Sequence, residues 1–166
     1  MSSSLRLSRE FCGLGVNGVF APGGIQRLSD SMSNPKLLAL APDLTRQAPR
    51  SALAPLGVYG AIAARMVDKC RAELVGKSGS YNYNCPLDRV FFRFTGIDAE
   101  EFQRFVATGA GDDEVARWIG KNSKVQDLNR VRSWSRRFQF NPIVRILDVD
   151  DWVHNRRNRM AKARAN

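Results

Sequence analysis

Apolar residues recur every three or four positions through most of residues 59–140, which is the spacing of amphipathic helices. The clearest stretch covers residues 59–75, where one face is apolar and the rest is charged. The predicted apolar face is Tyr59, Ile62, Ala63, Met66, Cys70 and Leu74, and the charged remainder is Arg65, Asp68, Lys69, Arg71 and Glu73. Gly76 is placed to end this helix, because glycine adopts the left-handed backbone that closes many helices.

Three shorter helices are predicted between residues 86 and 120 from their start and stop signals. Pro86 suits the first position of a helix, where its missing N–H is not needed, and Gly96 can end that helix. Asp98 is expected to cap the next helix, and the acidic residues 112–114 favour the N-terminus of a third. Their predicted buried faces are Leu87, Val90, Phe91 and Phe94, then Phe102, Phe105 and Val106, then Val115, Trp118 and Ile119.

Two further helices are predicted in the C-terminal part. Residues 124–137 present an apolar stripe of Val125, Leu128, Val131, Trp134 and Phe138. A last helix is expected over residues 152–163. Polar and aromatic residues alternate over residues 81–84, which favours a short extended segment there.

The N-terminal part shows no sustained apolar period, because glycine and proline interrupt it repeatedly. We therefore expect residues 1–42 to be a disordered extension, residues 43–155 to form the helical domain, and residues 156–166 to form a basic tail. The predicted fold class is mainly α, a compact bundle of about five or six helices with a short extended segment.

The formal net charge of +10 is distributed unevenly. Residues 1–50 carry a net charge of +3, residues 51–120 of −1, and residues 121–166 of +8. A localised cationic field favours polyanions such as RNA, DNA or an acidic membrane surface. The alternative is a solvated basic face that only keeps the protein in solution.

Cysteine and histidine are sparse. The three cysteines, Cys12, Cys70 and Cys85, have no metal-ligand spacing, and His154 is the only histidine. This pattern predicts no disulfide framework, no metal site and no cofactor, and it suits a reducing compartment such as the cytoplasm. No apolar run reaches the 18 or so residues of a transmembrane helix, so we expect no membrane insertion.

Several unusual clusters occur in a fixed order along the middle of the chain. They are Asp43-Leu44-Thr45, Pro49-Arg50-Ser51, Met66 with Asp68, Lys69 and Arg71-Ala72, Tyr81 to Asp88, Phe92, Phe94, Gly96-Ile97-Asp98 and Trp118. In these clusters the chain resembles a bacterial family known as domain of unknown function 5069, over about residues 43–120. Residues 121–140 and the basic tail depart from that pattern. The resemblance implies the fold but no activity, so it assigns no catalytic residue.

Cys85 is the only candidate for a catalytic residue. The following proline disfavours helical geometry at Cys85, which places the thiol beside a helix N-terminus. The helix dipole there stabilises a thiolate. The alternative is a structural cysteine, because the neighbouring aromatic residues resemble core. The same segment supplies the predicted ligand pocket, namely Tyr81, Asn82, Tyr83, Asn84, Cys85, Asp88 and Arg89.

The basic C-terminal quarter leads to the main functional hypothesis, which is a non-enzymatic helical module that contacts an anionic macromolecule, with RNA favoured over DNA. The expected anion-binding residues are Arg130, Arg132, Arg136, Arg137, Arg156, Arg157, Arg159, Lys162 and Arg164. Two alternatives stay open, a protein–protein adaptor without chemistry and a Cys85-dependent enzyme or redox protein. The sequence does not specify the oligomeric state.

Overall fold

The computed structural model describes residues 34–142 and residue 144. Within them it contains six helices and no strand, which confirms the mainly helical fold class. The helices are α2 (Pro35–Leu40), α3 (Ala63–Leu74), α4 (Pro86–Thr95), α5 (Ala99–Ala107), α6 (Asp112–Asn122) and α7 (Leu128–Gln139). No helix in this part of the chain is long and apolar enough to cross a membrane.

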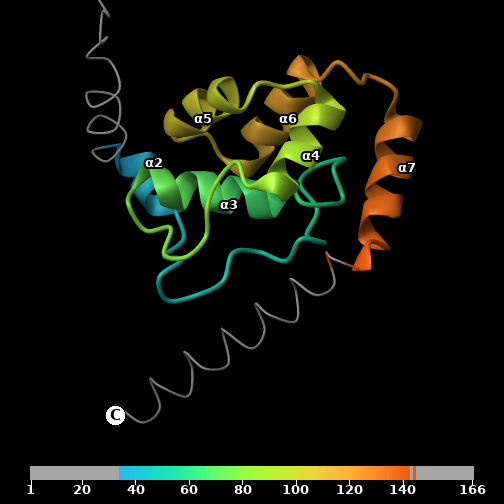
Figure 1. Ribbon diagram of the computed structural model, residues 1–166. Coiled ribbons are helices and arrows are strands. Elements are labelled where there is room, and N and C mark those ends of the chain that lie inside the picture. The colour runs from blue at the N-terminus through green and yellow to red at the C-terminus, as the bar shows by residue number, and fades with distance from the viewer. Residues whose placement is uncertain (1–33, 143, 145–166) are drawn as a thin grey trace, which may run out of the picture.

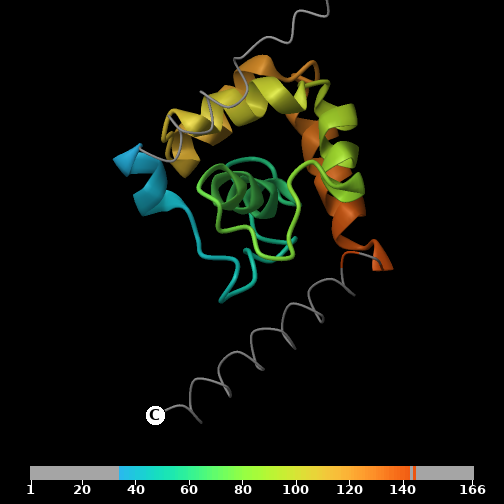
Figure 2. The same ribbon diagram turned by 60° about the vertical axis from the view of Figure 1, so that its left-hand side comes forward.

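Helix α3 lies at the centre of the molecule. Figure 2 shows it almost end-on, with α2 on one side, α5 and α6 above it, and α4 and α7 on the other side. The same helices surround α3 in Figure 1. All residues of α3 except Glu73 are buried.

The buried charges of α3 overturn the sequence interpretation of this helix. Arg65, Asp68, Lys69 and Arg71 were predicted to occupy an outer, charged face, yet their exposed fractions are only 3–6%. An isolated buried charge is strongly unfavourable, so each of these groups needs a partner from another element.

The start of α3 also differs from the prediction. Tyr59, Ala61 and Ile62 are buried, but residues 59–62 are not helical. Leu56 and Tyr59 exchange two backbone hydrogen bonds (2.8 and 3.0 Å) across a tight turn. Ile62 then takes a left-handed backbone conformation, with φ of 55°, directly before Ala63. The predicted helix therefore loses its first four residues to this turn.

The local signals between residues 86 and 122 are confirmed. Pro86 opens α4, and Gly96 ends it with φ of 70°. Asp98 caps α5 by accepting hydrogen bonds from the N–H groups of Glu100 and Glu101. The acidic residues 112–114 form the first turn of α6.

Helix α7 begins later than predicted. Lys124 N donates a hydrogen bond to Thr95 O (2.7 Å), and the Ser123 hydroxyl accepts one from Val125 N (3.1 Å). Residues 123–125 therefore form a connection that lies against the end of α4. Leu128, placed in the apolar stripe by its spacing, is 50% exposed. The attachment of α7 to α4 depends on Trp134, whose ring stacks on Phe94 with centroids 4.4 Å apart.

Two other segments differ from expectation. Residues 34–42, predicted to belong to the extension, contain α2, whose Leu37 is fully buried. The Asn34 side chain donates to Ala107 O (3.0 Å) and so ties α2 to the end of α5. Residues 81–84 form no strand, since Tyr83 and Asn84 lie in a turn. The extension before residue 34 and the predicted helix at 152–163 lie outside the described residues.

A buried ion pair joins α3 to α4. Lys69 Nζ donates to both carboxylate oxygens of Asp88, each at 2.7 Å, and the two side chains are 4% and 0% exposed. Asp88 also accepts the N–H of Cys85 (3.3 Å), so it fixes the first turn of α4.

Replacing Lys69 by methionine is expected to lower the free energy of unfolding by about 3–5 kcal/mol, because it leaves the Asp88 carboxylate buried without a cation. Adding Asp88→Asn should recover a large part of the loss, since the amide is neutral and still accepts the Cys85 N–H. Urea unfolding of both variants measures this. A loss below about 1 kcal/mol in the single variant would contradict a buried, charged pair.

Candidate functional site

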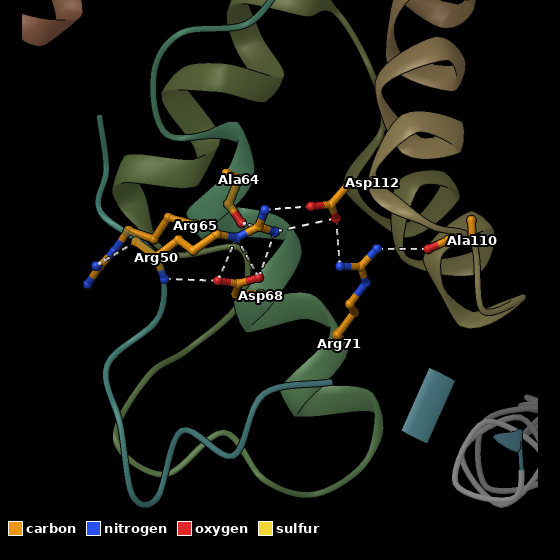
Figure 3. A network of polar contacts seen from close by, with 7 residues as sticks. All are labelled: Arg50, Ala64, Arg65, Asp68, Arg71, Ala110 and Asp112. Carbon is orange, nitrogen blue, oxygen red and sulfur yellow. Dashed lines mark hydrogen bonds and ion pairs between the residues drawn. The ribbon is translucent and has the colours of Figure 1, made fainter. Parts of the chain in front are cut away.

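Arg50 links the loop before α3 to two carboxylates (Figure 3). Its Nε and Nη2 donate to both oxygens of Asp68 on α3 at 2.7–3.0 Å, and its Nη1 donates to Asp112 at 2.5 Å. The backbone N–H of Arg50 also donates to Asp68 (2.9 Å). Burial lowers the pKa of Arg50, but the hydrogen bonds to the two carboxylates raise it more, so the guanidinium stays charged.

Asp112, at the start of α6, is held by a second cation from α3. Arg71 Nη1 donates to its Oδ1 (2.7 Å), and Arg71 Nη2 donates to Ala110 O (2.8 Å). Partial burial raises the pKa of Asp112, but the hydrogen bonds from Arg50 and Arg71 lower it more, so the net pKa is below the ordinary 3.8. The network therefore holds the loop, α3 and α6 together, and its two carboxylates are paired with arginines of the same domain.

Cys85 lies at the N-terminus of α4, where the sequence predicted it, and it is half-buried. Lys69 Nζ donates to its sulfur at 3.2 Å, a longer contact than the two 2.7 Å contacts to Asp88. The carboxylate is thus the principal partner of Lys69. Cys70, on α3, is enclosed in the core, and burial raises the pKa of its thiol.

The structure separates the other predicted pocket residues. Tyr83 is part of the core: its ring stacks on Phe102 and its hydroxyl donates to Ala99 O (2.7 Å). Tyr81 is half-buried, with the Arg65 guanidinium 5.5 Å from its ring centroid. Asn82 is exposed. With Asp88 also inside the protein, two of the predicted residues remain available on one surface, Asn84 and Arg89.

Asn84 and Arg89 line an open hollow of about 480 Å³ beside α4. Two polar residues that were not predicted for the pocket, Arg93 and Asp98, also line this hollow. Arg93 follows Arg89 by four residues, and this helical spacing was the available signal. The Lys124 side chain packs against Gly96 in the wall of the hollow, because a Cβ added to Gly96 would lie 2.6 Å from Lys124 Cδ.

The described anion-binding candidates all lie on α7. Arg130, Arg132, Arg136 and Arg137 are exposed. Within the described part of the chain, no ion pair or side-chain hydrogen bond engages any of them. Helix α7 stands at one edge of the molecule, away from α5 (Figure 1). The remaining candidates, Arg156, Arg157, Arg159, Lys162 and Arg164, lie outside the described residues, as do Cys12 and His154.

No group of three or more histidine, cysteine, aspartate or glutamate side chains in the described residues is arranged to hold a metal ion. The geometry therefore offers two kinds of surface, a basic helix and a hollow rimmed by arginine.

These features define a class of protein, an all-helical domain built around a buried charged helix and carrying a basic helix at its edge. The chain belongs to the family described as Domain of unknown function (DUF5069), whose model matches residues 46–166. The match confirms the resemblance seen in the sequence. It also extends through the C-terminal quarter, which appeared from the sequence to depart from the family pattern. No curated protein was found to match the chain.

Replacing Asp112 by asparagine is expected to destabilise the protein at neutral pH, because Arg50 and Arg71 lose their shared anion. The pKa of Asp112 is lowered in the folded state, so its contribution is present above 3.8 and is lost as the pH falls through the lowered value. The wild-type and variant stabilities should therefore converge in acid. Urea midpoints across a pH series test this, and a difference that stays constant into acid would contradict it.

Proposed function

We propose that this domain is a non-enzymatic RNA-binding module that contacts the RNA backbone through the exposed arginines of α7, continued by the basic residues after it. The observation that carries the proposal is a helix with four exposed arginines and no acidic partner among the described residues. Lysine and arginine that neutralise phosphates release counterions from a nucleic acid, and this release drives sequence-independent binding.

Helix α7 uses one face for packing and leaves the rest free. Val131, Ser135 and Phe138 are buried, and Trp134 packs on Phe91 and Phe94. Asp127 is the one acidic residue between residues 121 and 144, and its side chain accepts the N–H of Asn129 as the helix cap. Acidic side chains on this segment therefore do little to offset the positive charge of its outer face.

An exposed aromatic ring favours single-stranded nucleic acid over polyanions that carry no bases. Phe140 follows α7 directly, close in sequence to Arg136 and Arg137, and it is 72% exposed. Basic side chains beside an exposed ring are how proteins bind single strands without sequence preference, since each base can stack on the ring. The two aromatic residues of α7 itself, Trp134 and Phe138, stack on each other and pack against the domain.

The alternatives have less support. For a Cys85-dependent enzyme, the cation nearest the sulfur is already paired with Asp88. For an adaptor that docks through residues 81–89, an exposed apolar patch would be expected there. The large exposed apolar side chains of the described residues lie elsewhere, at Leu38, Leu40, Val58, Leu128 and Phe140.

The pair Arg132→Gln and Arg136→Gln tests the basic helix. Each phosphate contact adds roughly 0.7 to the slope of log affinity against log salt for a single strand, so the pair should flatten this slope by about 1.4. Fluorescence anisotropy of a short labelled RNA of mixed sequence, across a salt series with the full chain, measures the slope.

Arg104→Gln with Arg117→Gln is the matched control, because both residues are exposed and lie on α5 and α6. This pair removes the same charge and should leave the slope nearly unchanged. Equal effects of the two pairs would show that net charge matters and the position of α7 does not. Absence of RNA binding at low salt would refute the proposal.

The variant Phe140→Ala separates stacking from charge. We expect a loss of about 1–3 kcal/mol in RNA binding with no change in salt slope, because the ring contributes stacking and no charge. The fold should be unaffected, since the side chain is 72% exposed. The same anisotropy series measures both quantities, and an unchanged affinity would remove stacking at this position from the proposal.

A further inference from the structure

We infer that the hollow beside α4 binds one ribonucleotide unit, with its phosphate on Arg89 and Arg93 and its ribose hydroxyls on Asp98. This inference deepens the proposed RNA-binding function and rests on it where the nucleotide belongs to an RNA chain. A free ribonucleoside monophosphate offers the same chemical groups, and the test below distinguishes the two sources.

The phosphate position follows from two arginines on one edge of α4. Arg89 and Arg93 are exposed and lie one helical turn apart, so their side chains are neighbours. Arg89 Nε donates to the backbone oxygen of Asn84 (3.0 Å), which is held in a left-handed turn with φ of 56°. This contact orients the Arg89 guanidinium and leaves its two terminal nitrogens for an anion.

The Arg93 side chain has no hydrogen bond or ion pair within the described residues. A phosphate accepts paired hydrogen bonds from guanidinium groups, and a group already fixed by the protein loses less entropy on binding. One anchored arginine and one free arginine at the same rim therefore form a suitable phosphate site.

The ribose position follows from Asp98, which lines the same hollow. Its Oδ1 accepts the N–H groups of Glu100 and Glu101 at 2.9 and 3.0 Å, as the cap of α5. Its other oxygen has no partner among the described residues, and the side chain is exposed. A carboxylate oxygen is an acceptor for ribose hydroxyls, and the 2′-hydroxyl distinguishes RNA from DNA.

Phe92 and Ile97 are the larger apolar residues that line the hollow. Both residues are 7% exposed, so the small apolar surface that they offer to a base is fixed by the core. The hollow is also close to the basic helix in sequence and space. Lys124, whose stem packs on Gly96 in the wall, precedes the first residue of α7 by four positions. Lys124 therefore adds a cation beside the hollow, in the segment that leads into α7.

The test compares the full chain with three variants against labelled RNA and DNA of one sequence. Arg93→Gln removes the unpartnered arginine, and Arg89→Gln with Arg93→Gln removes both. Asp98→Ser keeps a residue that caps helices well but removes the second carboxylate oxygen. The control is again Arg104→Gln with Arg117→Gln, and circular dichroism confirms that each variant is folded.

We expect the double arginine variant to bind RNA about tenfold more weakly than wild type, which corresponds to losing one or two charge-assisted hydrogen bonds. Arg93→Gln alone should show part of this loss, and the control should show little. Asp98→Ser should bind RNA and DNA equally, whereas wild type prefers RNA. The contrary result is that both arginine variants retain wild-type RNA affinity while the α7 variants bind RNA more weakly. That result would overturn the proposed nucleotide site in the hollow and leave the proposed function intact.

Uridine 5′-monophosphate titrated into isotope-labelled protein identifies the source of the nucleotide. Shifts of the Asn84, Gly96 and Ala99 amide signals, abolished in the double arginine variant, support a site that also accepts a free nucleotide. Shifts seen with RNA alone support a nucleotide within a chain. Nucleotide binding without any RNA binding supports the hollow and overturns the proposed function. No response to either ligand overturns both.

Discussion

The pairing of charges on the central helix is the constraint on which the rest of this structure depends. Helix α3 has charged side chains inside the protein, and each of them must be matched by a group from another segment. Arg50 from the preceding loop, Asp88 from α4 and Asp112 from α6 supply the matching charges. A shift of any of these segments by one residue would strand a buried charge. The ion pairs therefore specify how the segments are placed around α3. Buried charges can matter more for this specificity than for the net free energy of unfolding.

The same pairing explains what the family resemblance encodes. Arg50, Asp68, Lys69, Arg71 and Asp88 belong to the clusters on which the resemblance rests, and all of them are members of the internal ion pairs. Asp68, Lys69, Arg71 and Asp88 are enclosed by the fold, Arg50 is half-buried, and each of the five forms an ion pair within the domain. These residues of the family resemblance thus contribute to how the segments of the domain are held around α3.

The arginines of α7 contrast with the charges around α3. The internal pairs match the carboxylates of Asp68, Asp88 and Asp112 with the cations Arg50, Lys69 and Arg71, whereas the arginines of α7 are exposed without partners among the described residues. The hollow beside α4 adds Arg89 and Arg93 to these exposed cations. An RNA strand along α7 and a nucleotide in the hollow would use the same electrostatic field, with the hollow supplying the contacts that a uniform basic surface lacks.

The sequence alone determined the features that depend on neighbouring residues. Pro86, Gly96, Asp98 and the acidic residues 112–114 act within one turn of a helix, so both ends of α4 and the starts of α5 and α6 could be predicted. The concentration of arginine after residue 121 could be read directly as well. Tertiary structure decided the burial of the charges on α3, because their partners lie 18 to 41 residues away and leave no mark on local periodicity. Tertiary structure also decided where α3 and α7 begin, because the turn before α3 and the connection before α7 are held by contacts with other segments. The polar residues that meet at the hollow come from different segments as well, and a helical pattern does not contain this information.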